Sequence, residues 1–445
     1  EYIYVRGHLI GLDAAGTALG AYGHHGIWIT DSPHNRIGGD SALKRNVISG
    51  NGYNGVLIEG AASTLNRLEN NYIGTNQSGT LGIPNFWSGV EIKDGAHGNT
   101  IGGDARAEGN LISNNKLNGL VISGTGSDDN LVSANWIGVD SSGLEELGNW
   151  DYGVVISAGA QDNIIGGSAA DAGTRNVIAG NGDGNVRITD VDSNYNEVIG
   201  NYIGPDISGT LGFRLSNDGV QIVNGASHNT VGTCADYEAN LFSANPGYGI
   251  LISADGADYN TVACNLIGVA ADGVSVLSNE RYGVIIAQDA SHNTIGPENI
   301  IANNLYDGVM VGGTTSDANK ITRKSIYNNT ISGIFLHLSG NNDIPAPVIT
   351  GATIGGGAGH DDAVSGTACA SCVVEVFASP SPDGEGQDYL GTVTATAGGV
   401  FNLTGITLSH AYLTATAYKA ADGTSEFSAV YYGPFEYIYL PVISK

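Results

Sequence analysis

The chain has 445 residues, with 17 Lys and Arg against 44 Asp and Glu, so its formal net charge is −27 at pH 7. A surface this acidic repels phosphate backbones, which argues against nucleic acid as a partner. The sequence contains no run of about 18 apolar residues, so we expect no membrane span. Its 68 glycines and 41% hydrophobic content suit a large, regular core rather than a disordered chain.

The sequence begins at Glu1, without an initiator Met or a charged and then apolar leader. We therefore expect a mature product whose signal peptide has been removed, located outside the cell or on its surface.

Residues 1–341 form a repeat array. An Ile-Gly pair recurs with glycines at Gly11, Gly74, Gly138, Gly204 and Gly268, at intervals of 63, 64, 66 and 64 residues. A second motif, G-[VI]-x-[IVL], occurs twice as often and starts at Gly26, Gly55, Gly89, Gly119, Gly153, Gly219, Gly249, Gly283, Gly308 and Gly333, with Asn185 in the glycine position of NVRI. The 64-residue unit is therefore two layers.

Each layer holds three short β segments, as in GVEI, NTIGG and NLISNN from Gly89 onward. Alternating aliphatic residues indicate strands, and such short runs between Gly and Asn turns exclude helices. The pattern predicts an all-β fold, a right-handed parallel β-helix of about eleven rungs, on the order of 50 Å long. Insertions alternate between two corners, after the second strand in one layer and after the third in the next.

Asparagine has a physical role in such an array, because it tolerates left-handed backbone at turns and forms side-chain ladders when stacked. We expect two files, one of Asn46, Asn110, Asn176, Asn240 and Asn299, the other of Asn51, Asn115, Asn181, Asn245 and Asn304.

These repeats resemble the parallel β-helix repeats of the pectin-lyase-like superfamily, in the N-x-I-G-G…N-x-I-x-x-N-x-x-x-G-[VI]-x-I variety of large exported bacterial proteins. The resemblance covers residues 1–341 and implies the fold. It implies no single activity, because that superfamily contains lyases, hydrolases, epimerases, adhesins and structural fibres.

The pattern stops at a predicted linker, residues 342–347. Residues 348–433 alternate apolar and polar side chains, as in VVEVFAS and AYLTATAYKA, and predict a small antiparallel β-sandwich. This stretch resembles bacterial Ig-like domains around SGTACASCVVEVF and TATAYKAADGTSEFS. Residues 434–445 are a hydrophobic, β-prone C-terminal strand or tail.

Two disulfides are expected. Cys369 and Cys372 form a CASC, and a zinc site would need a second such pair, which the sequence lacks. Cys234 and Cys264 occupy equivalent places in successive layers, with the register open by one residue, so stacking would bring them within about 4.8 Å. Two bridges imply an oxidising, exported setting.

Chemistry on a β-helix of this kind is expected on the outward face of the first strand. The outward positions are Trp28, Leu57, Glu91, Val121, Val155, Arg187, Gln221, Leu251, Ile285, Met310 and Phe335. The resemblance implies either an Arg or Lys lyase base with Asp-held calcium, or two or three glycosidase carboxylates.

Only two places could seed a catalytic cleft: Glu91 with Lys93, and Arg187 with Asp183, Asp190 and Asp192 nearby. A solvated, salt-linked arginine is the alternative for Arg187. The stretch Gly23-His24-His25-Gly26 is similar to the G-H-G of pectin hydrolases, but no paired aspartates precede it by one layer. We assign no catalytic residue.

Aspartate-rich turns at Asp13, Asp140 and Asp206 suit calcium, the one metal considered. Asn76 and Ala270 occupy the equivalent place, which favours turn capping instead, and we assign neither metal nor cofactor.

The apolar outward residues predict interfaces, Trp28 with Leu57 at one end and Leu251, Ile285, Met310 and Phe335 at the other, where the C-terminal module would fold over them.

The chain begins inside a layer, without its first strand, and an open sheet edge invites another strand. The pentads Glu1 to Val5 and Glu436 to Leu440 are nearly identical and β-prone. We expect Tyr437, Ile438, Tyr439 and Leu440 of one copy to complete the first rung of the next, giving a head-to-tail homopolymer.

Two functions remain. The first is an extracellular structural or adhesive protein, such as a filament or surface-layer subunit, with itself or a cell-surface glycan as partner. The alternative is a polysaccharide lyase or glycoside hydrolase that acts on an extracellular glycan.

Overall fold

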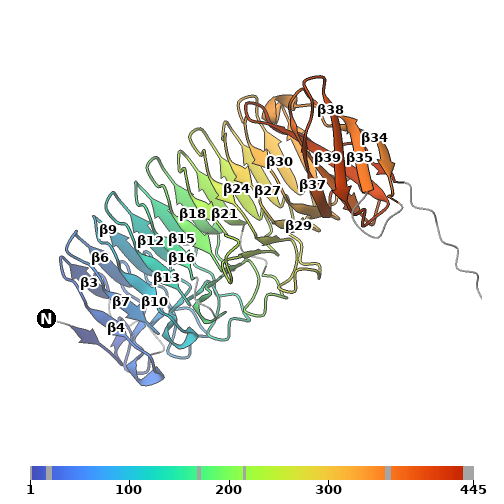
Figure 1. Ribbon diagram of the computed structural model, residues 1–445. Coiled ribbons are helices and arrows are strands. Elements are labelled where there is room, and N and C mark those ends of the chain that lie inside the picture. Colours follow the sequence, from blue (N-terminus) through green and yellow to red (C-terminus); the bar gives the residue numbers. More distant parts are fainter. Residues whose placement is uncertain (1–2, 17–22, 168–171, 214–216, 356–361, 434–445) are drawn as a thin grey trace, which may run out of the picture.

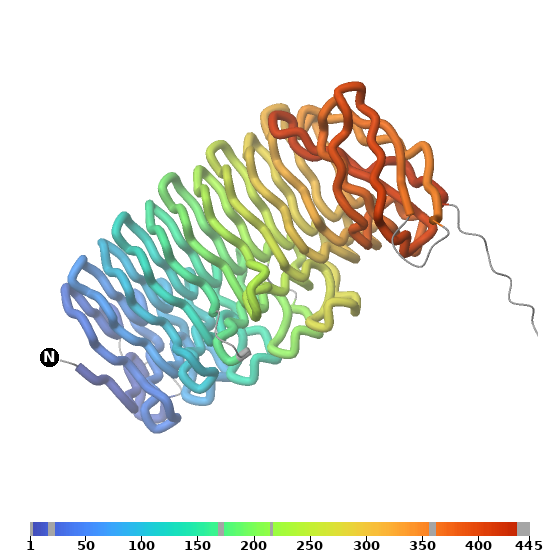
Figure 2. Tube along the Cα trace, viewed as in Figure 1, coloured from blue at the N-terminus to red at the C-terminus, as the bar shows by residue number. Residues whose placement is uncertain are grey.

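The computed structural model describes residues 3–16, 23–167, 172–213, 217–355 and 362–433. Three parallel sheets of eleven strands each form a long rod, in which every layer contributes one strand to each sheet (Figure 1). The layers follow one another in sequence order along the rod (Figure 2). The prediction of a parallel β-helix is confirmed.

Sheet 1 holds the first strand of each layer, and its outer face carries the outward positions predicted above. Its strands are β3 (Ile27–Thr30), β6 (Val56–Glu59), β9 (Val90–Lys93), β12 (Leu120–Ser123), β15 (Tyr152–Ser157), β18 (Gly184–Thr189), β21 (Asp218–Val223), β24 (Ile250–Ser253), β27 (Val284–Ala287), β30 (Val309–Gly312) and β33 (Ile334–His337).

Sheets 2 and 3 hold the second and third strands. Sheet 2 comprises β1 (Tyr4–Val5), β4 (Arg36–Gly38), β7 (Arg67–Glu69), β10 (Thr100–Gly102), β13 (Leu131–Ser133), β16 (Ile164–Gly166), β19 (Glu197–Ile199), β22 (Thr230–Val231), β25 (Thr261–Val262), β28 (Thr294–Ile295) and β31 (Lys320–Ile321). Sheet 3 comprises β2 (Leu9–Ile10), β5 (Val47–Ile48), β8 (Tyr72–Ile73), β11 (Leu111–Ile112), β14 (Trp136–Ile137), β17 (Val177–Ile178), β20 (Tyr202–Ile203), β23 (Leu241–Phe242), β26 (Leu266–Ile267), β29 (Ile300–Ala302) and β32 (Ser325–Tyr327).

The core is a stack of aliphatic side chains that repeats with the layers. In sheet 1, Ile92 pairs in register with Ile58 on one side and Ile122 on the other, and all three are fully buried. Burying a side chain of this size stabilises the fold by roughly 1.5–3 kcal/mol. Because each layer repeats this arrangement, the core runs the length of the rod.

The insertions lie at two corners, as predicted. Those after sheet 2 contain short 3-10 helices, η1 (Ala42–Lys44), η2 (Arg106–Glu108) and η3 (Ala172–Thr174). Those after sheet 3 close on themselves through the bridges Thr75 to Gly82, Val139 to Glu146, Pro205 to Gly212 and Val269 to Val276.

Three asparagine ladders, rather than two, run through the rod. In each, the Nδ2 of one residue donates to the Oδ1 of the next asparagine, which lies one layer on except around Asn185 in ladder 3. Ladder 1 is Asn35, Asn66, Asn99, Asn130, Asn163, Asn196, Asn229, Asn260, Asn293 and Asn319. Ladder 2 is Asn46, Asn71, Asn110, Asn135, Asn176, Asn201, Asn240, Asn265 and Asn299. Ladder 3 is Asn51, Asn85, Asn115, Asn149, Asn181, Asn185, Asn245, Asn279, Asn304 and Asn329. The two predicted files are therefore alternate members of ladders 2 and 3, and ladder 1 was missed.

The C-terminal module, residues 348–433, is antiparallel as predicted. One sheet contains β34 (Val348–Thr353), β35 (Asp362–Thr367) and β38 (Val400–Ile406); the other contains β37 (Asp388–Thr394), β36 (Val373–Ser379), β39 (Tyr412–Lys419), β40 (Gly423–Thr424) and β41 (Tyr431–Tyr432). The short helix η4 (Gly340–Asp343) leads into it, where the sequence predicted a linker.

The module sits on the end of the β-helix (Figure 1). Asn329 of ladder 3 donates to Glu385 at 3.1 Å, and Asn341, which follows ladder 1, donates to the Thr424 carbonyl at 2.9 Å. Lys324 occupies the position of the ladder 2 asparagine in the last layer, and its ammonium lies 3.4 Å from Glu375. The module thus caps all three ladders. The module also bonds to the last strand of sheet 1, where the Leu336 backbone N–H donates to Glu426 at 3.0 Å, but its coverage of the file from Leu251 to Phe335 stays a prediction.

Candidate functional site

The outer face of sheet 1 has the register that the sequence predicted. Strand pairing puts Trp28 beside Leu57 and continues layer by layer to Phe335. Trp28 and Phe335 are exposed, whereas Leu57, Ile285 and Met310 are buried. Residues inside the file are flanked by side chains on both neighbouring strands, while those on the two end strands have only one neighbour. The exposed apolar surface is therefore smaller than expected.

Aromatic rings gather at the N-terminal end of this face. The ring of Tyr53 lies 4.6 Å from that of Trp87 and 5.4 Å from that of His24, measured between centroids. His25 lies 5.3 Å from Tyr53 and 5.7 Å from Trp28. These five residues come from the corner before sheet 1 and from β3, in three successive layers.

The cluster continues along the same corner. The Lys116 ammonium lies 3.9 Å from the ring centre of Phe86, the neighbour of Trp87 in sequence, and 5.5 Å from that of Trp150. We call His24, His25, Trp28, Tyr53, Phe86, Trp87, Lys116 and Trp150 the aromatic strip. Tryptophan is usually well buried. Here three of the four tryptophans lie in the strip, with exposed fractions of 59% for Trp28, 44% for Trp87 and 59% for Trp150.

Polar groups line the strip on the sheet 1 side. The Trp28 indole donates to Glu59 at 2.8 Å, and the Lys93 ammonium lies 3.5 Å from the other Glu59 oxygen. Asn54 donates to Glu91 at 2.6 Å. The predicted candidates Glu91 and Lys93 therefore do lie together, and Glu59, which the sequence analysis overlooked, joins them. Glu59 pairs with Lys93 across β6 and β9, so strand register could have revealed it.

His25 lies at the centre of the strip. Burial lowers the pKa of its imidazole, and the nearby Glu91 carboxylate opposes that shift only in part. Its Nδ1 is buried and has no hydrogen-bond partner in the described part of the chain. A neutral ring with one unpaired nitrogen suits contact with a hydroxyl group.

Arg187, the other predicted candidate, lies farther along the same face. Its guanidinium donates to the Tyr152 hydroxyl at 2.7 Å, and that hydroxyl lies 3.3 Å from Gln221. Gln221 in turn donates to Asp218 at 2.8 Å. Within the described residues, no carboxylate lies within ion-pair distance of Arg187, so the predicted link to Asp183, Asp190 or Asp192 is absent.

A cavity of about 300 Å³ adjoins Arg187, lined also by Tyr248, Leu251 and Ile285. Asp218 accepts the backbone N–H of Tyr248, one of the lining residues. Burial raises the pKa of Asp218, although hydrogen bonds from Tyr248 and Gln221 act the other way. A carboxyl group next to an arginine could take part in acid-base chemistry, but here a tyrosine and a glutamine stand between the two.

In the aspartate-rich turns, the carboxylate oxygens accept hydrogen bonds from backbone N–H groups of the same turn. Asp140 accepts bonds from the backbone N–H groups of Ser142 and Leu144, and Asp206 accepts from those of Thr210 and Leu211. Asn76 caps its turn in the same way. Turn capping accounts for these residues, and calcium binding there stays an untested prediction.

Both predicted cysteine pairs are confirmed. Cys234 is joined to Cys264, and Cys369 to Cys372. Among the described residues, the one group of three potential metal ligands is Cys234, Cys264 and Glu298, and its sulfurs are bonded to each other. In the same ranges, no helix is long and apolar enough to cross a membrane.

No family model and no curated protein matches the chain. Among solved structures, it matches the crystal structure of full-length tailspike protein 2 from Escherichia coli O157:H7 bacteriophage CAB120, with 10% sequence identity and a TM-score of 0.36. The match covers 98% of this chain and 65% of the tailspike chain, so this chain spans less than two thirds of that protein. We base no argument about function on a similarity this low. The fold and the strip define a β-helical protein with an exposed aromatic surface.

Proposed function

We propose that this chain is an extracellular adhesive protein that binds a neutral glycan along the aromatic strip. The observation that carries the proposal is the exposure of three tryptophans in the strip, where ring contacts link Trp28 to Trp87 and the Lys116 ammonium lies over Trp150. Exposed apolar surface of this kind marks an interaction site. The flat face of an indole fits the C–H face of a sugar ring.

The polar groups of the strip suit the same ligand. Glu59, Glu91 and Asn54 offer oxygen and amide groups that can bond to sugar hydroxyls. Two lysines, Lys93 and Lys116, offset most of the charge of Glu59, Glu91 and Asp94, and the chain as a whole has a net charge of −27. A neutral polysaccharide is therefore favoured over an acidic one at this surface.

Two further observations support an extracellular location. Two disulfides point to an oxidising compartment. The strongly acidic composition keeps a long rod soluble and apart from other anionic surfaces.

The proposal is tested by measuring the binding of neutral polysaccharides to the purified protein and to Trp28→Ala and Trp87→Ala. We expect each substitution to weaken binding at least about tenfold, because exposed aromatic anchors carry much of the energy of such contacts. Affinity electrophoresis in gels that contain each polysaccharide gives the dissociation constants.

Tyr259→Ala is the matched control. Tyr259 is also aromatic and 51% exposed, but it stacks between His228 and His292 at another corner. The proposal is wrong if the wild type binds no neutral glycan, or if the control loses as much affinity as the tryptophan variants.

Hydrolysis of the bound glycan is the second candidate function. The observation that favours it is the presence of two carboxylates, Glu59 and Glu91, on neighbouring strands of one face. Glu59→Gln and Glu91→Gln should then still bind the glycan but no longer hydrolyse it. Hydrolysis is measured as the appearance of new reducing ends. If the wild type produces no new reducing ends, hydrolysis is ruled out and adhesion is the remaining function.

Head-to-tail assembly remains a separate proposal. Its donor residues, Tyr437 to Leu440, lie outside the described residues. Deletion of residues 434–445 should abolish polymers in negative-stain micrographs, and unchanged polymers would contradict it.

A further inference from the structure

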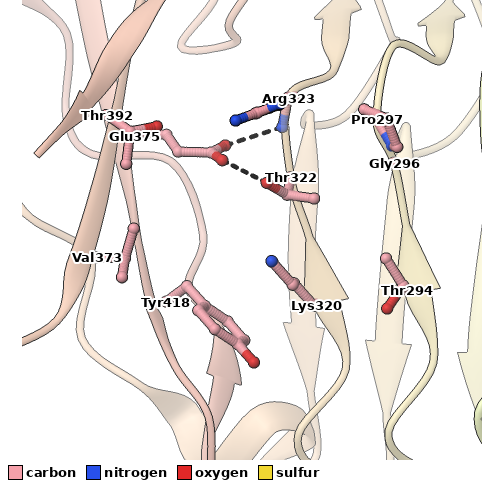
Figure 3. A pocket seen from close by; sticks show the side chains of 10 residues that line it. All are labelled: Thr294, Gly296, Pro297, Lys320, Thr322, Arg323, Val373, Glu375, Thr392 and Tyr418. Atoms are coloured by element: carbon pink, nitrogen blue, oxygen red, sulfur yellow. Dashed lines mark hydrogen bonds between the residues drawn. The ribbon is translucent and has the colours of Figure 1, made fainter.

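A second candidate ligand site lies where the C-terminal module meets the β-helix. A cavity of about 340 Å³ opens there, which falls in the range of small-molecule sites. Figure 3 shows Thr294, Lys320, Thr322 and Arg323 on the β-helix side and Glu375 and Tyr418 on the module side. We call this cavity the junction pocket. It is on the sheet 2 side of the rod, away from the aromatic strip.

The junction pocket carries unpaired positive charge. In the described part of the chain, neither Lys320 nor Arg323 lies within ion-pair distance of a carboxylate. The one acidic residue in the lining, Glu375, already accepts bonds from the Thr322 hydroxyl and, at 3.0 Å, from the Arg323 backbone N–H. It also pairs with the buried Lys324.

Two basic side chains without an ion pair line this cavity, in a chain that has only 17 Lys and Arg against 44 Asp and Glu. A neighbouring cavity of similar volume is lined by both Arg323 and Glu298, but among the described residues no ion pair joins the two. With Glu375 matched by Lys324, the pocket has two positive charges in excess. An anion is therefore the expected ligand.

The other residues that line the pocket indicate which kind of anion would fit. Three threonines, Thr294, Thr322 and Thr392, place hydroxyl groups around the pocket. The Tyr418 ring lies 5.1 Å from the Lys320 ammonium and offers a flat face beside that charge. Hydroxyl groups and an aromatic face suit a polyhydroxylated ring, whereas a simple inorganic anion would use only the charges.

The walls of the pocket are held in place before any ligand arrives. The backbone N–H of Ile326 donates to the Gly386 carbonyl at 2.9 Å, and that of Thr424 donates to the Asn319 carbonyl at 3.0 Å. These bonds tie the module to the last layers on both sides of the pocket. A preformed site loses less entropy on binding than one that must assemble.

We propose that the junction pocket binds the carboxylate of an acidic sugar, with Lys320 and Arg323 holding the carboxylate and Tyr418 facing the ring. Arg323 can form two parallel hydrogen bonds to a carboxylate, and Lys320 supplies a point charge. The sugar can be a free hexuronic acid or the end of an acidic polysaccharide, since both present the same group.

The test is calorimetric titration of the full chain with four probes: glucuronate, an oligogalacturonide, glucose and inorganic sulfate. We expect glucuronate and the oligomer to bind, glucose not to bind, and the affinity to fall as salt rises. If the oligogalacturonide binds much more tightly than glucuronate, the natural ligand is a polysaccharide end. If the two bind with equal affinity, it is the free acid. Both results support the proposal. Sulfate binding as tight as glucuronate binding would overturn the sugar assignment.

The variants Arg323→Gln and Lys320→Gln provide a second test of the proposal. Because Arg323 is exposed and Lys320 half-buried, we expect both variants to fold, and circular dichroism checks that. Each should weaken glucuronate binding at least about tenfold. The matched control is Lys419→Gln, a lysine beside Tyr418 that pairs with Asp422 at 2.8 Å. Undiminished binding by Arg323→Gln and Lys320→Gln, or no binding by the wild type, would overturn the proposal.

Discussion

At the scale of single residues, asparagine is the unit that joins one layer to the next. A primary amide both donates and accepts, so a file of buried amides satisfies itself along the rod, as Asn110 does between Asn71 and Asn135. Most of these Nδ2 atoms also donate to a backbone carbonyl, that of Leu68 in the case of Asn110. A buried polar side chain is costly unless it is paired in this way.

Asn185 shows how the ladder adapts to an exception. In the regular layers the ladder residue precedes the motif glycine by four, as Asn149 precedes Gly153, and a Cβ on Gly153 would come within 2.8 Å of Asn181 of the next layer. In the sequence, the residue four before the next motif glycine, Gly219, is Leu215, which lies outside the described residues. Asn185, in the glycine position, instead bridges Asn181 and Asn245.

This arrangement makes a prediction for two substitutions. Asn185→Gly removes the bridge between Asn181 and Asn245, and we expect the free energy of unfolding to fall by about 1–3 kcal/mol. Adding Leu215→Asn restores the regular pattern of glycine and ladder asparagine, so the double variant should recover most of that loss. Urea denaturation followed by circular dichroism measures both. A double variant less stable than the single one would show that residue 215 does not belong to the ladder.

At the scale of elements, the docking of the module depends on charged groups at the ends of the ladders. Lys324 occupies the ladder 2 position in its layer and turns its ammonium toward Glu375 and the Thr416 hydroxyl, with the Phe377 ring 4.5 Å away. Burial lowers the pKa of this lysine to about 8, although Glu375 opposes the shift. Glu385 accepts both the backbone N–H and the side-chain amide of Asn329.

Glu385 predicts a pH dependence of the docking. Burial raises the pKa of its carboxyl group from 4.5 to about 7, despite the bonds from Asn329. A raised pKa means that the folded state holds the proton more tightly than the unfolded state. The stability associated with protonated Glu385 is therefore complete below about pH 4.5 and is lost as the pH rises through about 7, a change on the order of 3 kcal/mol.

Glu385→Gln keeps the shape of the side chain and removes the titration. We expect the wild type to lose stability relative to this variant between pH 5 and pH 7.5, measured as the urea midpoint at each pH. Parallel profiles for the two proteins would mean that Glu385 does not titrate in this range.

At the scale of the whole molecule, periodicity determined what could be predicted. The repeat spacing was enough for the three sheets, the register of the outward file from Trp28 to Phe335, and the disulfide between Cys234 and Cys264. The double period of 64 residues misled us about the ladders, because it showed only alternate layers. Ladder 1 had its own signal, the N-x-[IVL] that opens each sheet 2 strand, as at Asn66 and Asn130.

The site was predicted only in part, for a physical reason. Glu91 and Lys93 belong to one strand and were found from the strand pattern. The aromatic strip was not found, because its rings come from corner residues such as Tyr53 and Trp87, which have no fixed type from layer to layer. The junction pocket depends on contacts between residues more than fifty positions apart, such as Lys324 with Glu375 and Asn329 with Glu385. No periodicity links a repeat to a non-repeating module.

The two disulfides should differ in their effect on the stability of the molecule. The bridge from Cys234 to Cys264 spans 30 residues and that from Cys369 to Cys372 spans three. Loop-closure entropy gives about 3.5 kcal/mol for the first and about 2 kcal/mol for the second. Replacing each pair by serine and following urea unfolding checks this order. A larger loss from the shorter bridge would contradict the entropic account.

The direction of the ladder hydrogen bonds gives the rod an electrical polarity. Within the ladders, the N–H that joins one amide to the next points toward the C-terminal layers and the Oδ1 toward the N-terminal ones, so the amide dipoles add along the axis, as peptide dipoles do in a helix. The donor end meets the carboxylate of Glu385 and the carbonyl of Thr424, which suits its positive pole. At the acceptor end, the Oδ1 of Asn46 receives the backbone N–H of His8. Because the C-terminal module covers the donor end, a partner that stacks on the other end of the rod meets the acceptor pole, which favours hydrogen-bond donors and cations.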